Sequence, residues 1–164
     1  MTKDLTGAYA EWCFARNNTI EFIKGMDEMN LVTPLKRPEL DTFKKHVLEM
    51  IDVQEAYSNA IVTGKMSFAT LKGNDEFTEE VSTEELLKRL ELTDKKMKER
   101  LENAAFDFQI ECDGENKTLS SHLCALVSHE MFHIGQWIGF CYAQDIKIPS
   151  YLVDMWGLSV QNKE

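Results

Sequence analysis

Hydrophobic positions recur at steps of three and four residues in four stretches of this chain, which is the period of an amphipathic helix. The first stretch runs from Thr2 to about Met26. A linker follows over residues 27–37, where Pro34 would interrupt a helix unless it lay in the first turn. The pattern therefore predicts a first helix and then a break.

A second helix is predicted from Pro38, a residue suited to the first helical turn, to about Gly64, a residue typical of helix ends. The stripe of apolar and small polar residues that it would turn inward consists of Leu40, Phe43, Val47, Met50, Ile51, Gln54, Tyr57, Ser58 and Ile61. His46 lies on the same stripe, three residues after Phe43. We therefore expect the His46 side chain to face the core.

Residues 65–81 show no sustained period. Because neighbouring helices of a bundle are usually joined by about two to eight residues, a connection of this length indicates a crossover between helices that are not antiparallel neighbours. Ser82 and Glu85 then form the S-x-x-E pattern of a capping box, which predicts the start of a third helix. Its expected core positions are Leu86, Leu90, Thr93, Met97, Leu101 and Ala104.

A turn or loop is predicted over residues 106–117, and Thr118 can cap a fourth helix that ends before Pro149. The inward stripe of this helix is Leu119, His122, Leu126, His129, His133, Gln136, Trp137 and Phe140. A short tail would pack Tyr151, Trp156 and Leu158 onto the helices. With no convincing strand, the predicted fold is all-α: a single domain over residues 1–164, built as a four-helix bundle with a long crossover between helices two and three.

Composition narrows the class of protein. Hydrophobic residues make up 43% and charged residues 28% of the chain, as in an ordinary soluble domain. The formal net charge of -10 argues against nucleic acid and against an anionic membrane surface as partners. Without a signal-peptide core or a long apolar run, a cytoplasmic location is expected. The four cysteines show no CxxC spacing, so we expect free thiols, with Cys124 and Cys141 packed in the last helix.

The candidate chemistry lies on three histidines. His129 and His133 are four residues apart, which places both rings on one helix face about 6 Å apart. His46 points inward from another helix, and cores of bundles commonly hold metal sites built from facing helices. Three buried imidazoles without a partner would be costly, whereas one shared cation uses all three lone pairs. The pattern predicts a transition-metal site at His46, His129 and His133, with an open coordination position.

Two neighbouring residues are weaker candidates. The segment from His129 to His133 also matches H-E-x-x-H, in which the glutamate would act as a general base. The third ligand of a zinc peptidase is missing unless Asp154 serves. Glu130 lies about 100° round the helix from His129, so it is expected in an outer shell or at the surface. His122 lies seven residues before His129, too far along the helix to bind the same ion, and is expected at the core edge.

With His46, the H-x-x-x-H pair and the following Gly135 and Gln136, the chain resembles the DinB and YfiT-like superfamily of small metal-binding four-helix bundles. The residue after His133 is often arginine in that family, and here it is Ile134. The resemblance implies a divalent metal, commonly Zn or Ni with Fe as a further option, held by the three histidines. It also implies the long crossover and often a homodimer.

The resemblance leaves the function open. Characterised relatives are thiol S-transferases that use low-molecular-weight thiols such as bacillithiol, and others are described as metal-dependent hydrolases acting on a small amide or ester. The leading hypothesis is a metal-dependent thiol transferase with a small-molecule substrate, and the alternatives are such a hydrolase or a non-catalytic binding module. Cationic groups near the metal would favour an anionic thiol, whereas a site sealed by Trp12, Phe43 or Trp137 would favour the binding module. Gln136 would hydrogen-bond either a ligand or a polar group in the core.

Overall fold

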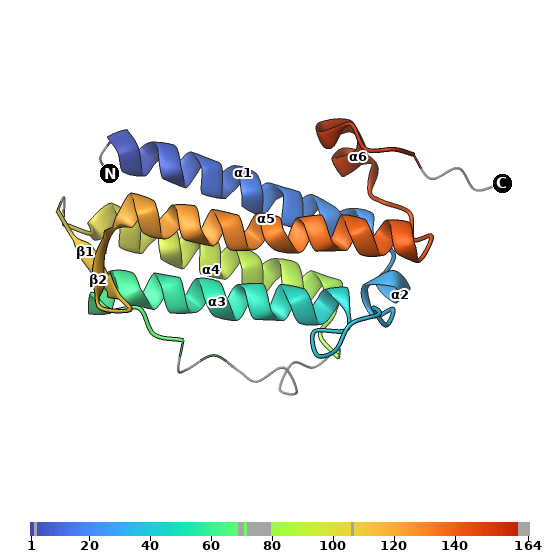
Figure 1. Ribbon diagram of the computed structural model, residues 1–164, viewed down its shortest axis with the longest axis horizontal. Helices are drawn as coiled ribbons and strands as arrows, with labels where there is room; N and C mark the ends of the chain where they lie inside the picture. Colours follow the sequence, from blue (N-terminus) through green and yellow to red (C-terminus); the bar gives the residue numbers. More distant parts are fainter. Residues whose placement is uncertain (2, 69–70, 72–79, 106, 161–164) are drawn as a thin grey trace.

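The computed structural model describes residues 1, 3–68, 71, 80–105 and 107–160, and within them the chain is mostly helical, as predicted (Figure 1). Four long helices lie side by side: α1 (Lys3–Gly25), α3 (Phe43–Thr63), α4 (Thr83–Asn103) and α5 (Leu119–Ala143). Two short helices, α2 (Glu28–Leu31) and α6 (Ser150–Trp156), lie toward one end. Thr2 and most of the predicted crossover, residues 69–70 and 72–79, lie outside the described residues.

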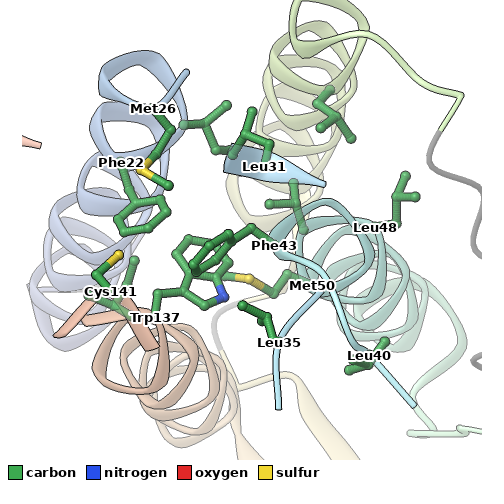
Figure 2. Close-up of a cluster of buried hydrophobic side chains, with 14 of the residues drawn as sticks. Phe22, Met26, Leu31, Leu35, Leu40, Phe43, Leu48, Met50, Trp137 and Cys141 are labelled. Carbon is green, nitrogen blue, oxygen red and sulfur yellow. The ribbon is translucent and has the colours of Figure 1, made fainter. Parts of the chain in front are cut away.

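The four long helices enclose the apolar core. Helix α5 contacts both α1 and α3, and α4 contacts both α3 and α1, so each long helix has two long neighbours. Phe22, Phe43 and Trp137 meet in one cluster of buried side chains, with the Phe22 and Trp137 rings 4.7 Å apart (Figure 2). Among the described residues, none of the helices combines the length and apolar composition that a membrane-spanning segment requires.

Helices α4 and α5 each begin at a side-chain N-cap that the sequence predicted. The Ser82 hydroxyl accepts a hydrogen bond from Glu85 N at 3.2 Å, and the Thr118 hydroxyl accepts one from Ser121 N at 3.2 Å. Gly64 ends α3 with a φ of 72°, a conformation that glycine adopts without steric cost. These three boundaries of α3, α4 and α5 are confirmed.

The predicted start of the second helix at Pro38 is wrong, because α3 begins at Phe43 behind an N-cap at Thr42. The Thr42 hydroxyl accepts a hydrogen bond from Lys45 N at 3.3 Å. Glu39 has a φ of 62°, which cannot continue a right-handed helix. Pro38 therefore lies in a loop, which the buried side chains of Leu35 and Leu40 hold against the core.

A β-hairpin occupies part of the segment that was predicted as a loop. Strand β1 (Gln109–Cys112) pairs antiparallel with β2 (Glu115–Thr118). The two residues between them, Asp113 and Gly114, have φ values of 54° and 84°. Two successive positive φ values at an Asp-Gly pair are typical of a type I′ hairpin turn, so the turn chemistry explains why two short strands form here. The expectation of no strand was wrong.

The cysteines and the C-terminal segment follow the predictions in part. None of the four cysteines, all of which are described, forms a disulfide, and Cys141 is buried, but Cys124 is exposed rather than packed in the core. In α6 the buried anchor is Leu152, whereas Trp156 remains 43% exposed. The Trp156 indole nitrogen donates to Asn18 Oδ1 at 2.8 Å, so a hydrogen bond rather than full burial attaches this ring to α1.

Candidate metal centre

Helices α3 and α5 bring the three predicted histidines together. His129 and His133 are one turn apart on α5, and their ring centroids lie 4.6 Å apart. His46, on the first turn of α3, has its ring centroid 5.0 Å from that of His133. His46 and His133 are buried, while the His129 side chain is 26% exposed, so the cluster reaches the surface at one end.

A carboxylate that the sequence analysis did not select completes the cluster. Glu49 lies one turn after His46 on α3, with Oε1 3.3 Å from His129 Nε2 and Oε2 3.1 Å from His133 Nε2. Glu49, His129 and His133 each offer a ligand atom, and these atoms all lie within 4.8 Å of one another. The geometry therefore points to a set of two histidines and one glutamate as ready ligands for a metal ion.

His46 contacts the same cluster from the other side of the His133 ring. Its Nδ1 lies 2.8 Å from His133 Nδ1, whereas the Nε2 of His133 is the atom that faces His129 and Glu49. His46 thus supports His133 directly in these ring orientations. It would bind the same ion as His129 only after a change of ring orientation.

Arg37, from the loop before α3, closes the inner end of the cluster. Its Nη1 lies 3.2 Å from His46 Nε2 and donates to Gln136 Oε1 at 3.2 Å. Gln136 was expected either to bind a ligand or to satisfy a polar group in the core. Its side-chain oxygen instead accepts a hydrogen bond from Arg37. Position 134, where the resembled family often has arginine, holds a buried isoleucine in this chain. The guanidinium beside the histidines comes instead from Arg37.

The hydrogen-bond directions follow from Arg37, since a guanidinium can only donate. His46 Nε2 must accept from Arg37, which places the proton of the neutral His46 ring on Nδ1. His46 Nδ1 then donates to His133 Nδ1, so the His133 proton is on Nε2. That nitrogen faces His129 Nε2 at 3.2 Å, which must accept in its turn.

This order leaves the exposed end of the cluster rich in lone pairs. His129 Nε2, as an acceptor, lies beside the Glu49 carboxylate, which is also an acceptor. Glu49 Oε2 and His129 Nδ1 are buried without a hydrogen-bond partner among the described residues. A cation between Glu49, His129 and His133 would satisfy the facing lone pairs, and its binding would displace the His133 Nε2 proton. The residues present therefore fit a transition-metal ion.

Electrostatics keep two of these groups in their ligating forms. Burial lowers the pKa of His46, the neighbouring His133 and Arg37 lower it in the same direction, and together they bring it to about 3. Burial alone would raise the pKa of Glu49, but its contacts with the His129 and His133 rings outweigh burial and bring the pKa to about 2. At neutral pH, His46 is therefore a neutral imidazole and Glu49 a carboxylate.

Aromatic side chains wall the inner part of the cluster and leave the outer part open. The ring centroids of Trp137 and Phe140 lie 6.1 Å and 6.3 Å from that of His46. Phe132, 63% exposed, lies 6.2 Å from His133 at the outer side. Trp12 packs elsewhere, under the Arg16 guanidinium. The aromatic rings therefore exclude water around His46 without sealing His129 and Glu49.

Glu130 does not belong to this cluster. It is fully buried on the side of α5 that faces α1, where Oε1 lies 3.3 Å from Arg16 Nη1 and accepts from the Thr19 hydroxyl. Arg16 also contacts Asp94 Oδ1 at 3.3 Å and donates to Gln54 Oε1 at 2.8 Å. Glu130 is thus part of a buried polar layer to which α1, α3, α4 and α5 each contribute, and its expected place at the surface is wrong.

His122 also lies apart from the cluster. It is buried, with its ring centroid 4.3 Å from that of Tyr57. Burial, followed by the nearby charge of Lys117, lowers its pKa to about 4, although a hydrogen bond with the Tyr57 backbone acts in the opposite direction. As expected, His122 lies apart from His46, His129 and His133, but its ring is packed rather than solvated.

No protein-family model and no curated protein matches this chain. The candidate centre therefore depends on its own geometry, and the resemblance to the DinB and YfiT-like superfamily stays a prediction.

Proposed function

We propose that this protein holds one divalent transition-metal ion, Zn or Ni with Fe as a further option, and uses it to transfer a low-molecular-weight thiol. The observation that carries the proposal is the convergence of Glu49, His129 and His133 at the edge of the apolar core. Three protein ligands leave a coordination position for another molecule, as in catalytic rather than structural sites.

Each residue of the centre has a separate task in this proposal. Glu49, His129 and His133 would hold the ion, and His46 would fix the orientation of His133 or replace Glu49 as a ligand. When bound, the ion would lower the pKa of a coordinated thiol and so supply a thiolate near neutral pH. The aromatic rings beside His46 exclude water from the inner side, and the exposed edges of His129 and Glu49 leave room for a small substrate.

A thiol transferase fits this site better than a hydrolase of a small amide or ester. Hydrolysis at a H-E-x-x-H helix relies on the glutamate as a general base, and Glu130 is buried against Arg16 of α1, outside the histidine cluster. A thiol starts from a pKa of about 8.5, against about 15.7 for water, so a bound metal ion reaches the thiolate with a much smaller lowering. The guanidinium of Arg37 beside His46 further favours a negatively charged thiol.

The fold that we propose is the four-helix bundle of the DinB and YfiT-like superfamily, with a crossover between α3 and α4. In support, α3 and α4 pack against each other, and the colours of Figure 1 show that both begin at the end where α2 lies. Helices α3 and α4 therefore run in the same direction (Figure 1), and two parallel neighbours that follow each other in the chain favour a crossover connection.

We also propose a homodimer in the cytoplasm, in contact through α5. The full length of α5 is described, and its exposed face consists of Ser121, Cys124, Ala125, Ser128, Phe132, Gly135, Gly139, Tyr142 and Ala143. This face carries no charged side chain, although the chain as a whole has a formal charge of -10. Two copies would repel least where they present an uncharged surface to each other.

Zinc titration of metal-free protein by calorimetry tests the metal site, with His133→Ala as the variant and His122→Ala as its matched control. We expect tight binding of one ion in wild type and His122→Ala, and loss of binding in His133→Ala. Consumption of a thiol in the presence of an electrophilic aryl halide then tests transfer. A metal-loaded wild type that consumes thiol no faster than His133→Ala would be a binding module, and the transferase proposal would be wrong.

A further inference from the structure

We propose that Arg16 is a positioning residue for the metal centre, because its guanidinium ties the two helices that supply the ligands, α3 and α5, to one point on α1. The inference rests on the metal site of the proposed function and is independent of the reaction at that site. Arg16 itself lies on a helix that supplies none of the proposed ligands. It would act by fixing where Glu49 lies relative to His129 and His133.

The link from Arg16 to α5 runs through Glu130. Arg16 Nη1 lies 3.3 Å from Glu130 Oε1, and both residues are buried. Glu130 directly follows His129 in the chain and precedes His133 by three residues. A helical segment this short moves as one body, because backbone hydrogen bonds join its successive turns. Arg16 therefore holds the turn of α5 that carries both histidines.

The link from Arg16 to α3 runs through Gln54. Arg16 Nη2 donates to Gln54 Oε1 at 2.8 Å, and Gln54 lies five residues after Glu49 on α3. Charge balance does not require this bond, because Asp94 and Glu130 already pair with the guanidinium and an amide carries no charge. Its effect is geometric, since it fixes α3 to the same guanidinium that holds α5.

The buried polar layer leaves the linked side chains little freedom. Gln54 also donates to Asp94 Oδ1 at 2.7 Å, and Gln54 Oε1 accepts from the Thr93 hydroxyl at 2.9 Å. The guanidinium stacks 4.6 Å from the centroid of the Trp12 ring. Displacing any of these groups would leave a buried charge or amide without its partner, which is costly. The separation of the linked points on α3 and α5 is therefore fixed from within the core.

The metal centre is sensitive to this separation because its ligands come from both helices. Glu49 Oε1 lies 3.3 Å from His129 Nε2, and Glu49 Oε2 lies 3.1 Å from His133 Nε2. Metal–ligand distances tolerate only about 0.2 Å of deviation. Loss of the Arg16 links should therefore weaken and reshape the site while leaving every ligand in the chain.

The test loads the protein with cobalt(II), whose visible absorption reports coordination number and geometry, and measures zinc affinity by competition with a chelator. Arg16→Met removes both links, and Gln54→Leu removes only the link to α3. We expect each variant to bind zinc about tenfold or more weakly than wild type, as loss of groups that orient ligands usually does, and to show an altered cobalt spectrum. If circular dichroism shows that Arg16→Met does not fold, Gln54→Leu, which keeps the ion pair with Glu130, decides the question.

Leu101→Ala is the matched control for stability. Leu101 is buried on α4, which supplies none of the proposed ligands, and it belongs to a core cluster with Ile110 of β1. Its truncation leaves a cavity that destabilises the folded chain, but the zinc affinity and the cobalt spectrum should stay as in wild type.

Two results would show that Arg16 is a structural residue only, while leaving the metal site standing. One is the zinc affinity and cobalt spectrum of wild type in folded Arg16→Met or in Gln54→Leu. The other is a loss of zinc affinity in Leu101→Ala as large as in those two variants, because affinity would then follow stability. Failure of wild type to bind cobalt or zinc would overturn the proposed metal site itself, and this inference with it.

Discussion

Replacing Arg16 by methionine should cost about 3–5 kcal/mol of unfolding free energy, because the variant leaves buried carboxylates without their cation. The Arg16 guanidinium lies 3.3 Å from both Glu130 and Asp94, donates to Gln54 at 2.8 Å, and stacks 4.6 Å above the Trp12 ring. Methionine keeps most of the apolar volume but none of the five donors. Glu130, fully buried, would retain the Thr19 hydroxyl as its donor.

Urea unfolding followed by far-UV circular dichroism measures the loss. A second variant, Arg16→Met with Glu130→Gln, should recover part of the stability, since the neutral amide needs no counter-charge. Arg89→Met, which breaks an exposed pair with Glu85, should cost less than about 1 kcal/mol. A loss below about 1 kcal/mol for Arg16→Met, or no recovery in the double variant, would refute the assignment of this layer as a coupled ionic network.

Two further predictions concern stability away from the metal centre. Burial holds the pKa of His122 at about 4 in the folded chain against 6.5 as the ordinary value, so the unfolded chain binds more protons between these pH values. This histidine should therefore lower stability by about 1.4 kcal/mol per pH unit as the pH falls from 6.5 to 4, and unfolding of His122→Phe at several pH values should show a correspondingly shallower decline. Gly25→Ala should destabilise by about 1–3 kcal/mol because its Cβ would lie 2.5 Å from Pro149 Cβ. Gly7→Ala, with nothing within 4 Å, should instead stabilise α1 by about 0.5–1 kcal/mol in thermal unfolding, and equal effects of both changes would contradict the packing of Gly25.

The helices and the histidine cluster could be predicted because both depend on local spacing. The hydrophobic period identified the long helices, and the hydroxyl caps at Ser82 and Thr118 located two of their starts. The spacing of His129 and His133 placed both rings on one face of α5. A histidine on an apolar stripe, such as His46, was correctly expected in the core.

The remaining parts of the site depend on contacts between distant segments. Glu49 is one turn after His46 and could have been noticed, but an acidic residue on a helix is usually solvated, so its spacing alone gave little signal. Arg37 lies in a loop without periodicity, and its position depends on Gln136, 99 residues later. Glu130 is buried because Arg16 reaches it from another helix, a pairing that the H-E-x-x-H pattern does not contain.

The β-hairpin was not predicted, although its turn carries a local sequence signal. Asp113 and Gly114 are a strong local signal for a type I′ turn, but the flanking strands have only four residues each, and the second strand, ENKT, has no apolar position. With polar and apolar residues alternating in the first strand alone, the turn signal favoured a loop as readily as a hairpin. The helix start predicted at Pro38 was wrong for a related reason, since the fixed φ of proline suits both a first helical turn and a loop.

Elemental analysis of protein purified without a metal-affinity tag decides whether Glu49, His129 and His133 hold a metal ion. We expect about one equivalent of Zn, Ni or Fe per chain in wild type and little in Glu49→Gln and His133→Ala, with His122→Ala unchanged. Wild type without metal, even after dialysis against Zn and Ni, would contradict the metal centre and leave Glu49 and the three histidines as a polar cluster of the core.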